Sequence, residues 1–269
     1  MKKRRTSAGS SLSDSIAFKK IFPKLLEIIL SACFWLVVWW IISIRINNTF
    51  LLPSPGDVIK ALGDIIVTEK FWKITSASLL RIMFGILIAT LGGIVLAIIT
   101  VKIRPVQTLV TPLMSAVKAT PVASFIILAL VWMSRNTLPV FITVLIVIPI
   151  VWTNVSAGLR SVDAGLLDVA QIYGFSRLKK LRMIYIPSVM PFFAAAFRTS
   201  LGMAWKAGIA AEVLSTPAEA IGTELYYSKT YLEMPALFAW TLVVIILSLI
   251  IEKLFVWALT RFGRSLNMQ

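Results

Sequence analysis

Long apolar runs separated by short charged segments dominate the chain. Four of these runs contain no Asp, Glu, Lys or Arg, and they cover residues 28–44, 82–101, 136–159 and 234–251. A bilayer core of roughly 30 Å is crossed by a helix of about 20 apolar residues, and the helix lets a single segment pair its own backbone polar groups. Two further runs, 105–134 and 188–211, are long enough to cross but contain charged residues. The pattern predicts an all-α integral membrane protein with about six transmembrane helices.

The polar segments between the runs divide the chain into four parts. Residues 1–20 are expected to form a disordered cytoplasmic tail, because they are polar and rich in Ser. Residues 21–73 hold the first transmembrane helix and an external linker, in which Pro53 and Pro55 favour an extended backbone before a short surface helix over 57–67. The other two parts are a membrane core over 74–264, with its longest polar loop at 160–187, and a cytoplasmic tail over 265–269.

Lys and Arg are distributed unequally between the two sides of the membrane. With six crossings, one side carries sixteen of them, in the N-terminal tail, the 102–104 turn, the 160–187 loop and the C-terminal end. The other side carries six basic residues and most of the acidic ones. Since cytoplasmic segments are enriched in Lys and Arg, both termini and the 160–187 loop are predicted to be cytoplasmic.

Composition excludes several classes of protein. Hydrophobic residues make up 58% of the 269 positions and the mean hydropathy is +0.89, well above the values of water-soluble domains. The net charge is +15, but the basic residues lie between the apolar runs rather than on one face with aromatic residues, so nucleic acid is not expected as a partner. His is absent and Cys33 is the single cysteine, which excludes a His proton relay, a Cys/His metal site and an intrachain disulfide.

Small residues recur at every fourth position of the second run, at Gly85, Ala89, Gly93 and Ala97. Such a stripe permits the close approach of another helix. Packing within the chain and contact between two copies of the chain both fit this pattern.

The 160–187 loop contains the sequence DVAQIYG at 168–174 and, after nine further residues, IYIP at 184–187. Residues 162–171 can form a short helix that ends at Gly174, whose missing side chain permits a tight turn. A second helix can run from Ser176 towards Pro187. A short helix held between two spans is a rigid knob suited to docking into a groove. The alternative is a solvated loop whose basic residues are attracted to anionic lipid.

On the docking interpretation, the polar side chains of the loop contact a partner and Ala170 is small enough for close approach. The candidate residues of this loop are Asp168, Ala170, Gln171, Gly174, Arg177, Ile184 and Pro187.

The spacing of the loop resembles the cytoplasmic signature of ATP-binding-cassette (ABC) importer permeases, usually written Glu-Ala-Ala, three residues, Gly, nine residues, Ile-x-Leu-Pro. Asp168, Val169 and Ile186 replace the Glu, the first Ala and the Leu of that signature. From residue 51 to about residue 264 the chain looks like the sulfonate, taurine, nitrate and bicarbonate branch of these permeases, in LLPSP at 51–55, GLRSVD at 158–163 and AAE at 210–212. The run KATPVA at 118–123 departs from the Arg-Pro-Ile-Pro-Pro-like run usual in that branch.

The resemblance implies a type I importer fold in which the 160–187 loop carries a coupling helix for separate ATPase subunits. The chain has no Gly-x-x-x-x-Gly-Lys-Ser/Thr phosphate loop, so it is expected to be no enzyme and to bind no cofactor of its own. ATP and Mg²⁺ would be bound by the partner ATPase subunits. The resemblance further implies a permease homodimer in the cell membrane and an external solute-binding protein.

The same resemblance implies that the solute is a small anion or a polar organic molecule, such as a sulfonate, taurine, nitrate or bicarbonate. A vitamin precursor such as a pyrimidine is the alternative within the same class of importer.

Ionisable side chains inside the predicted spans are the candidate contacts for the solute. Each costs about 3 kcal/mol at the bilayer centre on insertion scales, so such residues usually face the bundle interior or an aqueous cavity. Lys118 is expected near mid-span, three residues before Pro121, which removes a backbone hydrogen bond and can open the helix. Its ammonium could pair with an anionic solute or with a distant carboxylate.

The fifth predicted span also contains charged residues. Lys206 and Glu212 are six residues apart, and an ion pair between them is favoured over contact with solute. Arg198 is expected close enough to the cytoplasmic end for its long side chain to reach the membrane surface. The candidate pathway residues are Lys118, Pro121, Arg198, Lys206 and Glu212.

Two other classes of membrane protein share some of these features. A channel or secondary transporter would have similar spans and buried charges, but it does not need the 168–187 motif, and no internal duplication suggests inverted repeats. A membrane-embedded enzyme needs a nucleophile or an acid–base pair, and neither His nor paired carboxylates are present. The permease interpretation accounts for more of the sequence than either.

Overall fold

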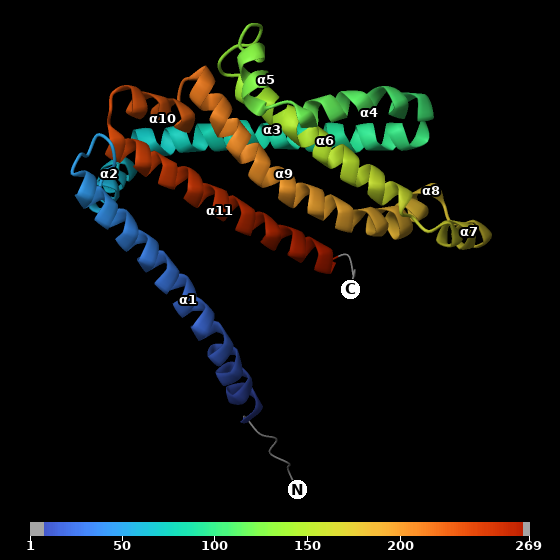
Figure 1. Ribbon diagram of the computed structural model, residues 1–269. Helices are drawn as coiled ribbons and strands as arrows, with labels where there is room; N and C mark the ends of the chain where they lie inside the picture. The colour runs from blue at the N-terminus through green and yellow to red at the C-terminus, as the bar shows by residue number, and fades with distance from the viewer. Residues whose placement is uncertain (1–7, 266–269) are drawn as a thin grey trace.

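The computed structural model describes the backbone of residues 8–265 and the side chains of residues 26, 27, 29–258 and 261 (Figure 1). Every regular element in this part of the chain is helical, which confirms the all-α prediction. The helices are α1 (Ala8–Ile46), α2 (Pro55–Ile66), α3 (Glu69–Lys102), α4 (Arg104–Ala119), α5 (Val122–Ala129), α6 (Leu138–Arg160), α7 (Ala164–Ile172), α8 (Arg177–Lys180), a π-helical turn (Leu181–Tyr185), α9 (Ile186–Ser215), α10 (Ile221–Thr230) and α11 (Met234–Ser265).

Four helices of the described residues are long and apolar enough to cross a membrane. Their spanning segments are Ile29–Ile46, Glu69–Lys102, Leu138–Arg160 and Met234–Ala258. Helices α4 and α5 pass the same test only as a pair, bent by 101°, and would make five spans. Helix α9 is 30 residues long, but it carries the charged residues of the fifth predicted span. Six crossings therefore stay a prediction.

The run 105–134, expected as one span, is broken in two by the bend between α4 and α5. Pro121 has no N–H, so α4 makes its last backbone hydrogen bond from Thr120 N to Ala116 O, at 3.1 Å. Thr120 precedes the proline and has extended backbone angles, φ −83° and ψ 132°. The bend confirms that Pro121 opens the helix and corrects the expectation of a continuous third span.

Helices α3, α6 and α9 pack against one another and form the centre of the molecule (Figure 1). The glycines of the small-residue stripe face α6: a Cβ on Gly85 would lie 2.9 Å from the Thr143 Cβ, and one on Gly93 would lie 2.8 Å from the Val151 Cβ. The stripe is therefore used for close packing within the chain. Trp205, on α9, is 1% exposed and donates its indole N–H to the Val244 carbonyl of α11, at 3.1 Å.

The N-terminal part of the chain differs from the expected tail. Helix α1 begins at Ala8, so the segment expected to be disordered over 1–20 is helical from that residue, while residues 1–7 lie outside the described part. Extending an existing helix costs little per residue, which explains how the first span continues into a polar segment. Helix α1 meets the bundle at its C-terminal end, where the Trp39 indole donates to the Pro53 carbonyl at 3.1 Å.

The surface helix expected over 57–67 is present as α2. Ser54 and Asp57 form a capping box at its start: the Ser54 hydroxyl accepts from the Asp57 N–H, and the Asp57 carboxylate accepts from the Ser54 N–H, both at 3.2 Å. These two bonds fix the point at which the linker after α1 becomes helical.

Candidate functional site

The short helix expected in the 160–187 loop is α7, and both of its ends are held by local hydrogen bonds. The Asp163 carboxylate accepts the Gly165 N–H at 2.7 Å and caps the N-terminus. At the C-terminus the Phe175 N–H bonds to the Ala170 carbonyl at 2.8 Å, and Gly174 takes a left-handed conformation with φ +62°. This ending favours glycine, because a side chain at that φ is strained.

The predicted contact residues of the loop divide into exposed and buried ones. Asp168 and Gln171 are exposed on α7, Gly174 is exposed in the turn, and Arg177 is exposed at the start of α8. Ala170 is only 2% exposed. Its small side chain is therefore used for packing inside the chain and is not available for close approach by a partner.

Three large apolar side chains of the same loop are strongly exposed. Ile172 is 82%, Tyr173 75% and Leu178 74% exposed, at the end of the molecule that lies farthest from α2 and α10 (Figure 1). Exposed apolar groups beside polar ones are typical of surfaces that bind a protein or a membrane. The loop thus combines a rigid backbone with an amphipathic outer surface.

The second half of the motif forms the start of α9. Pro187 has no N–H to give to the Met183 carbonyl, and the preceding turn, Leu181–Tyr185, is widened into a π-helix. Ile184 is 7% exposed, so it anchors this turn in the packed part of the chain rather than contacting a partner.

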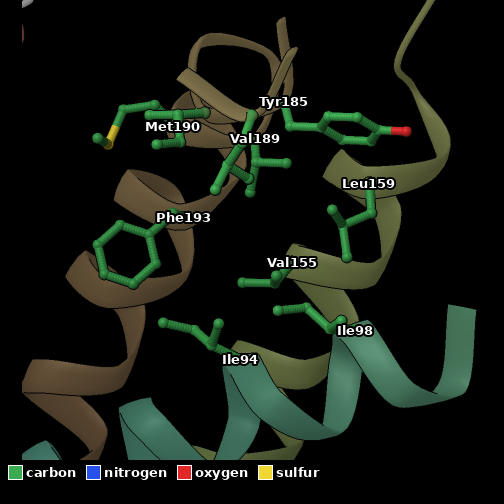
Figure 2. A pocket seen from close by; sticks show the side chains of 10 residues that line it. Ile94, Ile98, Val155, Leu159, Tyr185, Val189, Met190 and Phe193 are labelled. Atoms are coloured by element: carbon green, nitrogen blue, oxygen red, sulfur yellow. The ribbon is translucent and has the colours of Figure 1, made fainter. Parts of the chain in front are cut away.

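An apolar pocket of about 230 Å³ lies beside this π-helical turn, between α3, α6 and α9 (Figure 2). Its lining side chains are Ile94, Ile98, Val155, Leu159, Leu181, Tyr185, Ile186, Val189, Met190 and Phe193. The phenol of Tyr185 is the single polar group among these side chains. A polar or anionic solute would lose its hydration there without gaining hydrogen bonds, so the pocket does not suit such a solute.

Lys118 lies in the last turn of α4, next to the bend. Its ammonium donates to the Thr153 hydroxyl of α6 at 2.7 Å, and it forms no ion pair among the described residues. The side chain is exposed. Pro121, three residues later, is the first residue after the bend and is exposed as well.

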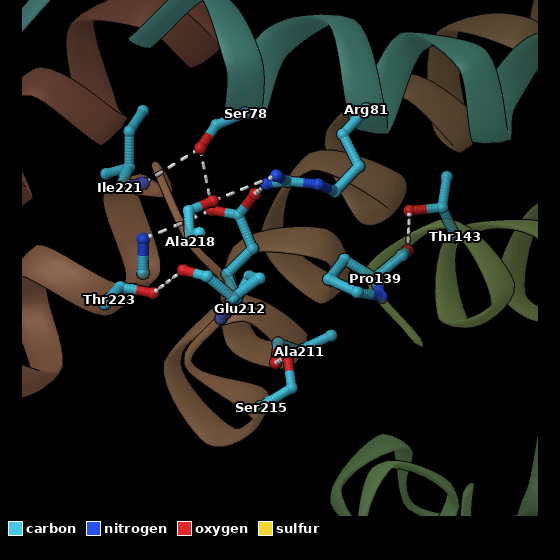
Figure 3. A network of polar contacts seen from close by, with 12 residues as sticks. Ser78, Arg81, Pro139, Thr143, Ala211, Glu212, Ser215, Ala218, Ile221 and Thr223 are labelled. Carbon is cyan, nitrogen blue, oxygen red and sulfur yellow. Dashed lines mark hydrogen bonds and ion pairs between the residues drawn. The ribbon is translucent and has the colours of Figure 1, made fainter. Parts of the chain in front are cut away.

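Glu212 forms an ion pair that the sequence analysis did not predict (Figure 3). Its carboxylate, fully buried, lies 2.6 Å from the Arg81 guanidinium of α3 and also accepts from the Ser78 hydroxyl at 2.9 Å. The N–H groups at the start of α10 join the network: Gly222 donates to the carboxylate at 3.2 Å, and Ile221 donates to the Ser78 hydroxyl at 2.8 Å. The network fastens α3, α9 and α10 together.

The expected pair between Lys206 and Glu212 is therefore wrong. Lys206 is exposed and forms no ion pair among the described residues, because its position on α9 directs it away from the α3 side, where Glu212 meets Arg81. Arg198 is exposed too, with no hydrogen bond to any described residue.

Arg81 was missed because it directly precedes the charge-free run 82–101 and was not treated as part of a span. A usable signal was present: no Pro or Gly interrupts the sequence from Glu69 to the first glycine of the run at Gly85. Helix α3 accordingly starts at Glu69, twelve residues before Arg81. Arg81 is thereby placed well inside the helix.

Several curated proteins are similar in sequence. The taurine transport system permease protein TauC of Escherichia coli (strain K12) is 25% identical over 224 residues, covering 81% of this chain and 81% of that protein. A putative ABC transporter permease protein of Methanocaldococcus jannaschii is 26% identical over 235 residues, 82% of this chain and 88% of the relative. The bicarbonate transport system permease protein CmpB of Synechococcus elongatus is 30% identical over 166 residues, 60% of this chain and 59% of the relative.

Solved ABC transporters share the fold. A chain of a bacterial transporter that imports the acidic polysaccharide alginate superposes with a TM-score of 0.61 at 15% identity, covering 91% of this chain and 97% of the other. A chain of an amino acid ABC transporter superposes with a TM-score of 0.52 at 16% identity, covering 84% and 98%.

The family model described as "binding-protein-dependent transport system inner membrane component" matches residues 82–267, more than half of the chain. Together with the relatives, this match assigns the type of subunit. The chain belongs to this family as a multi-pass membrane permease subunit of the sulfonate, taurine and bicarbonate branch of ABC importers.

Proposed function

We propose that the chain forms the solute pathway of an ABC importer and that α7 couples this pathway to separate cytoplasmic ATPase subunits. The observation that carries the proposal is α7 itself, a capped helix at one end of the molecule with exposed polar and apolar side chains. A rigid helix transmits a displacement to the spans on either side, α6 and α9. Nucleotide-driven movement of the ATPases would then shift the helices between two states, as ATP binds one state preferentially.

The proposed orientation places α7 and both termini in the cytoplasm, in agreement with the distribution of Lys and Arg. ATP and Mg²⁺ bind to the ATPase subunits in this scheme, and two copies of the permease form the pathway. An external solute-binding protein delivers solute, for which one solved relative of the fold, an alginate transporter in complex with a periplasmic protein, offers a precedent. The names of the taurine and bicarbonate relatives favour a small anion or polar molecule as solute.

The coupling proposal predicts that Gly174→Val abolishes solute-stimulated ATP hydrolysis in vesicles containing the assembled importer. A β-branched residue is strained at φ +62°, so the end of α7 must change. Asp168→Lys should have the same effect by reversing an exposed charge on α7.

Two matched variants separate a specific effect from general damage. Gly174→Asn should retain most of the activity, because Asn tolerates the left-handed region. Gly63→Val lies on α2, where a new side chain meets nothing within 4 Å, and should leave activity unchanged. Normal solute-stimulated hydrolysis with both Gly174→Val and Asp168→Lys would refute the coupling role of α7.

A further inference from the structure

Helix α4 has three chemically different faces. One face packs inward, and its members are Val106, Val110, Met114 and Val117. A second face is apolar and exposed, with Leu109 76% and Leu113 60% exposed. A third face is polar, and its members, here called the α4 polar stripe, are Gln107, Thr111, Ser115 and Lys118. At about 100° per residue, the polar stripe and the exposed leucines lie on roughly opposite sides of the helix.

The hydroxyl groups of the stripe already donate to their own helix. Thr111 bonds to the Gln107 carbonyl at 2.7 Å, and Ser115 bonds to the Thr111 carbonyl at 3.0 Å. This arrangement satisfies the O–H groups and leaves the hydroxyl oxygens as outward-facing acceptors.

The two ends of the stripe are not satisfied in this way. The Gln107 side chain forms no hydrogen bond with any described residue, and the Lys118 ammonium uses one of its three N–H groups on Thr153. An amide or an ammonium whose N–H groups lack hydrogen-bond acceptors costs several kcal/mol when it lies in hydrocarbon. The α4 polar stripe is therefore expected to contact water or polar groups, whereas the leucine face suits lipid.

The stripe reaches deep into the membrane. Lys118 is fourteen residues beyond Arg104, which corresponds to about 21 Å along the helix axis, compared with a bilayer core of about 30 Å. Helix α4 lies alongside the membrane-spanning α3, so this length is measured across the bilayer (Figure 1). Water in contact with the whole stripe would extend past the middle of the membrane.

We propose that the α4 polar stripe is a wall of the aqueous solute pathway and that Lys118, at the end of the stripe that lies deepest in the membrane, is a binding point for an anionic group. The proposal rests on the proposed function, since it specifies which surface of the permease faces the solute. The stripe offers hydrogen-bond acceptors along its length and a single cationic donor where α4 ends at the bend. That order of groups suits a hydrated small anion, whose charge Lys118 can pair with at mid-depth.

Cysteine accessibility tests the stripe without any solute or ATPase. In the full-length chain with Cys33→Ser, Thr111→Cys and Ser115→Cys place thiols on the stripe, and Leu109→Cys and Leu113→Cys place matched thiols on the leucine face. Membrane vesicles open to both sides are treated with small, charged, membrane-impermeant methanethiosulfonates. Thiols react as thiolates, which form in water and not in lipid, so the stripe cysteines should react at least about tenfold faster than the leucine-face cysteines.

The charge of the reagent tests Lys118. At Ser115→Cys, one turn from Lys118, an anionic reagent should react faster than a cationic one of similar size, and Lys118→Met should remove this preference. Equal rates for the two reagents, or a preference unaffected by Lys118→Met, would overturn the assignment of Lys118.

Two outcomes would overturn the proposal that the α4 polar stripe lines an aqueous pathway. Stripe cysteines as unreactive as the leucine-face cysteines would show that lipid or protein covers the stripe. Spontaneous disulfides between two copies at Ser115→Cys, without reaction towards the reagents, would make the stripe a helix–helix interface. If labelling succeeds while Gly174→Val leaves coupling intact, the coupling role of α7 fails and the stripe stands, so the two proposals are judged separately.

Discussion

Glu212 is the residue whose replacement has the most predictable cost. Its buried carboxylate neutralises the Arg81 guanidinium, which is itself only 14% exposed. Glu212→Gln keeps the shape but leaves the arginine charge without its partner, so the free energy of unfolding should fall by about 3 kcal/mol. The midpoint of unfolding in a denaturing-detergent titration measures this loss.

Double replacement provides the control for that prediction. Arg81→Met/Glu212→Gln removes both charges and should recover most of the lost stability, because the cost of a broken pair is largely the uncompensated charge. Lys206→Met should change the stability by less than about 0.5 kcal/mol, as expected for an exposed residue that forms no ion pair with any described residue. The opposite result, a large loss with Lys206→Met and none with Arg81→Met, would restore the Lys206 pairing.

At the scale of elements, the contact between α3 and α6 depends on glycines at defined positions. A Cβ at Gly93 would lie 2.8 Å from the Val151 Cβ, whereas one at the neighbouring Gly92 meets the Ile148 Cδ1 at an ordinary 3.8 Å. Gly93→Ala should therefore destabilise the protein by about 1–3 kcal/mol through overpacking. Gly92→Ala should be neutral or slightly stabilising, because Ala favours the helix by up to about 1 kcal/mol.

The denaturing-detergent titration also checks the contact between α3 and α6. Gly93→Ala/Val151→Ala should be less destabilised than the sum of its single variants, since removing the valine methyl groups makes room for the new one. Equal stability of Gly92→Ala and Gly93→Ala would contradict the close approach of α3 and α6.

At the scale of the whole molecule, the number of crossings decides on which side each terminus lies. Four plain spans, the bent α4–α5 pair and α9 give an even number, which places both termini on the same side of the membrane, and the distribution of Lys and Arg predicts that this side is the cytoplasm. A re-entrant α4–α5 pair would give an odd number and place the termini on opposite sides. In the Cys33→Ser background, an impermeant thiol reagent added to intact cells should label Val67→Cys, whose side chain is 87% exposed. It should not label Ile172→Cys or Ser265→Cys until the cells are permeabilised.

Each alternative gives a distinct labelling pattern. Reaction of Ile172→Cys from outside reverses the orientation of the whole chain. Reaction of Ser265→Cys from outside, with Ile172→Cys protected, means that the crossings between the α7 loop and the C-terminus are not two.

The structure of the 160–187 loop could be predicted closely because it is local. The glycine ending of α7, the proline at the start of α9 and the spacing between them are properties of short segments. Local sequence did not reveal which side chains of α7 turn inward. Ala170 is 2% exposed, and no neighbouring residue in the sequence indicates that its side chain turns inward.

The sequence by itself determined the helical membrane class and the positions of the plain spans, because each segment that crosses lipid must be apolar and must satisfy its own backbone hydrogen bonds. It also determined the surface helix α2 and the short helix of the 160–187 loop, whose capping and turn residues are local. Tertiary structure alone decided the partner of Glu212, the use of the small-residue stripe and the extent of the bend between α4 and α5. Arg81 and Glu212 are 131 positions apart, and only the packing of α3 against α9 brings them within 2.6 Å. A charge buried in a membrane needs a partner. The sequence predicts that such a partner exists, but it does not identify the helix that supplies it.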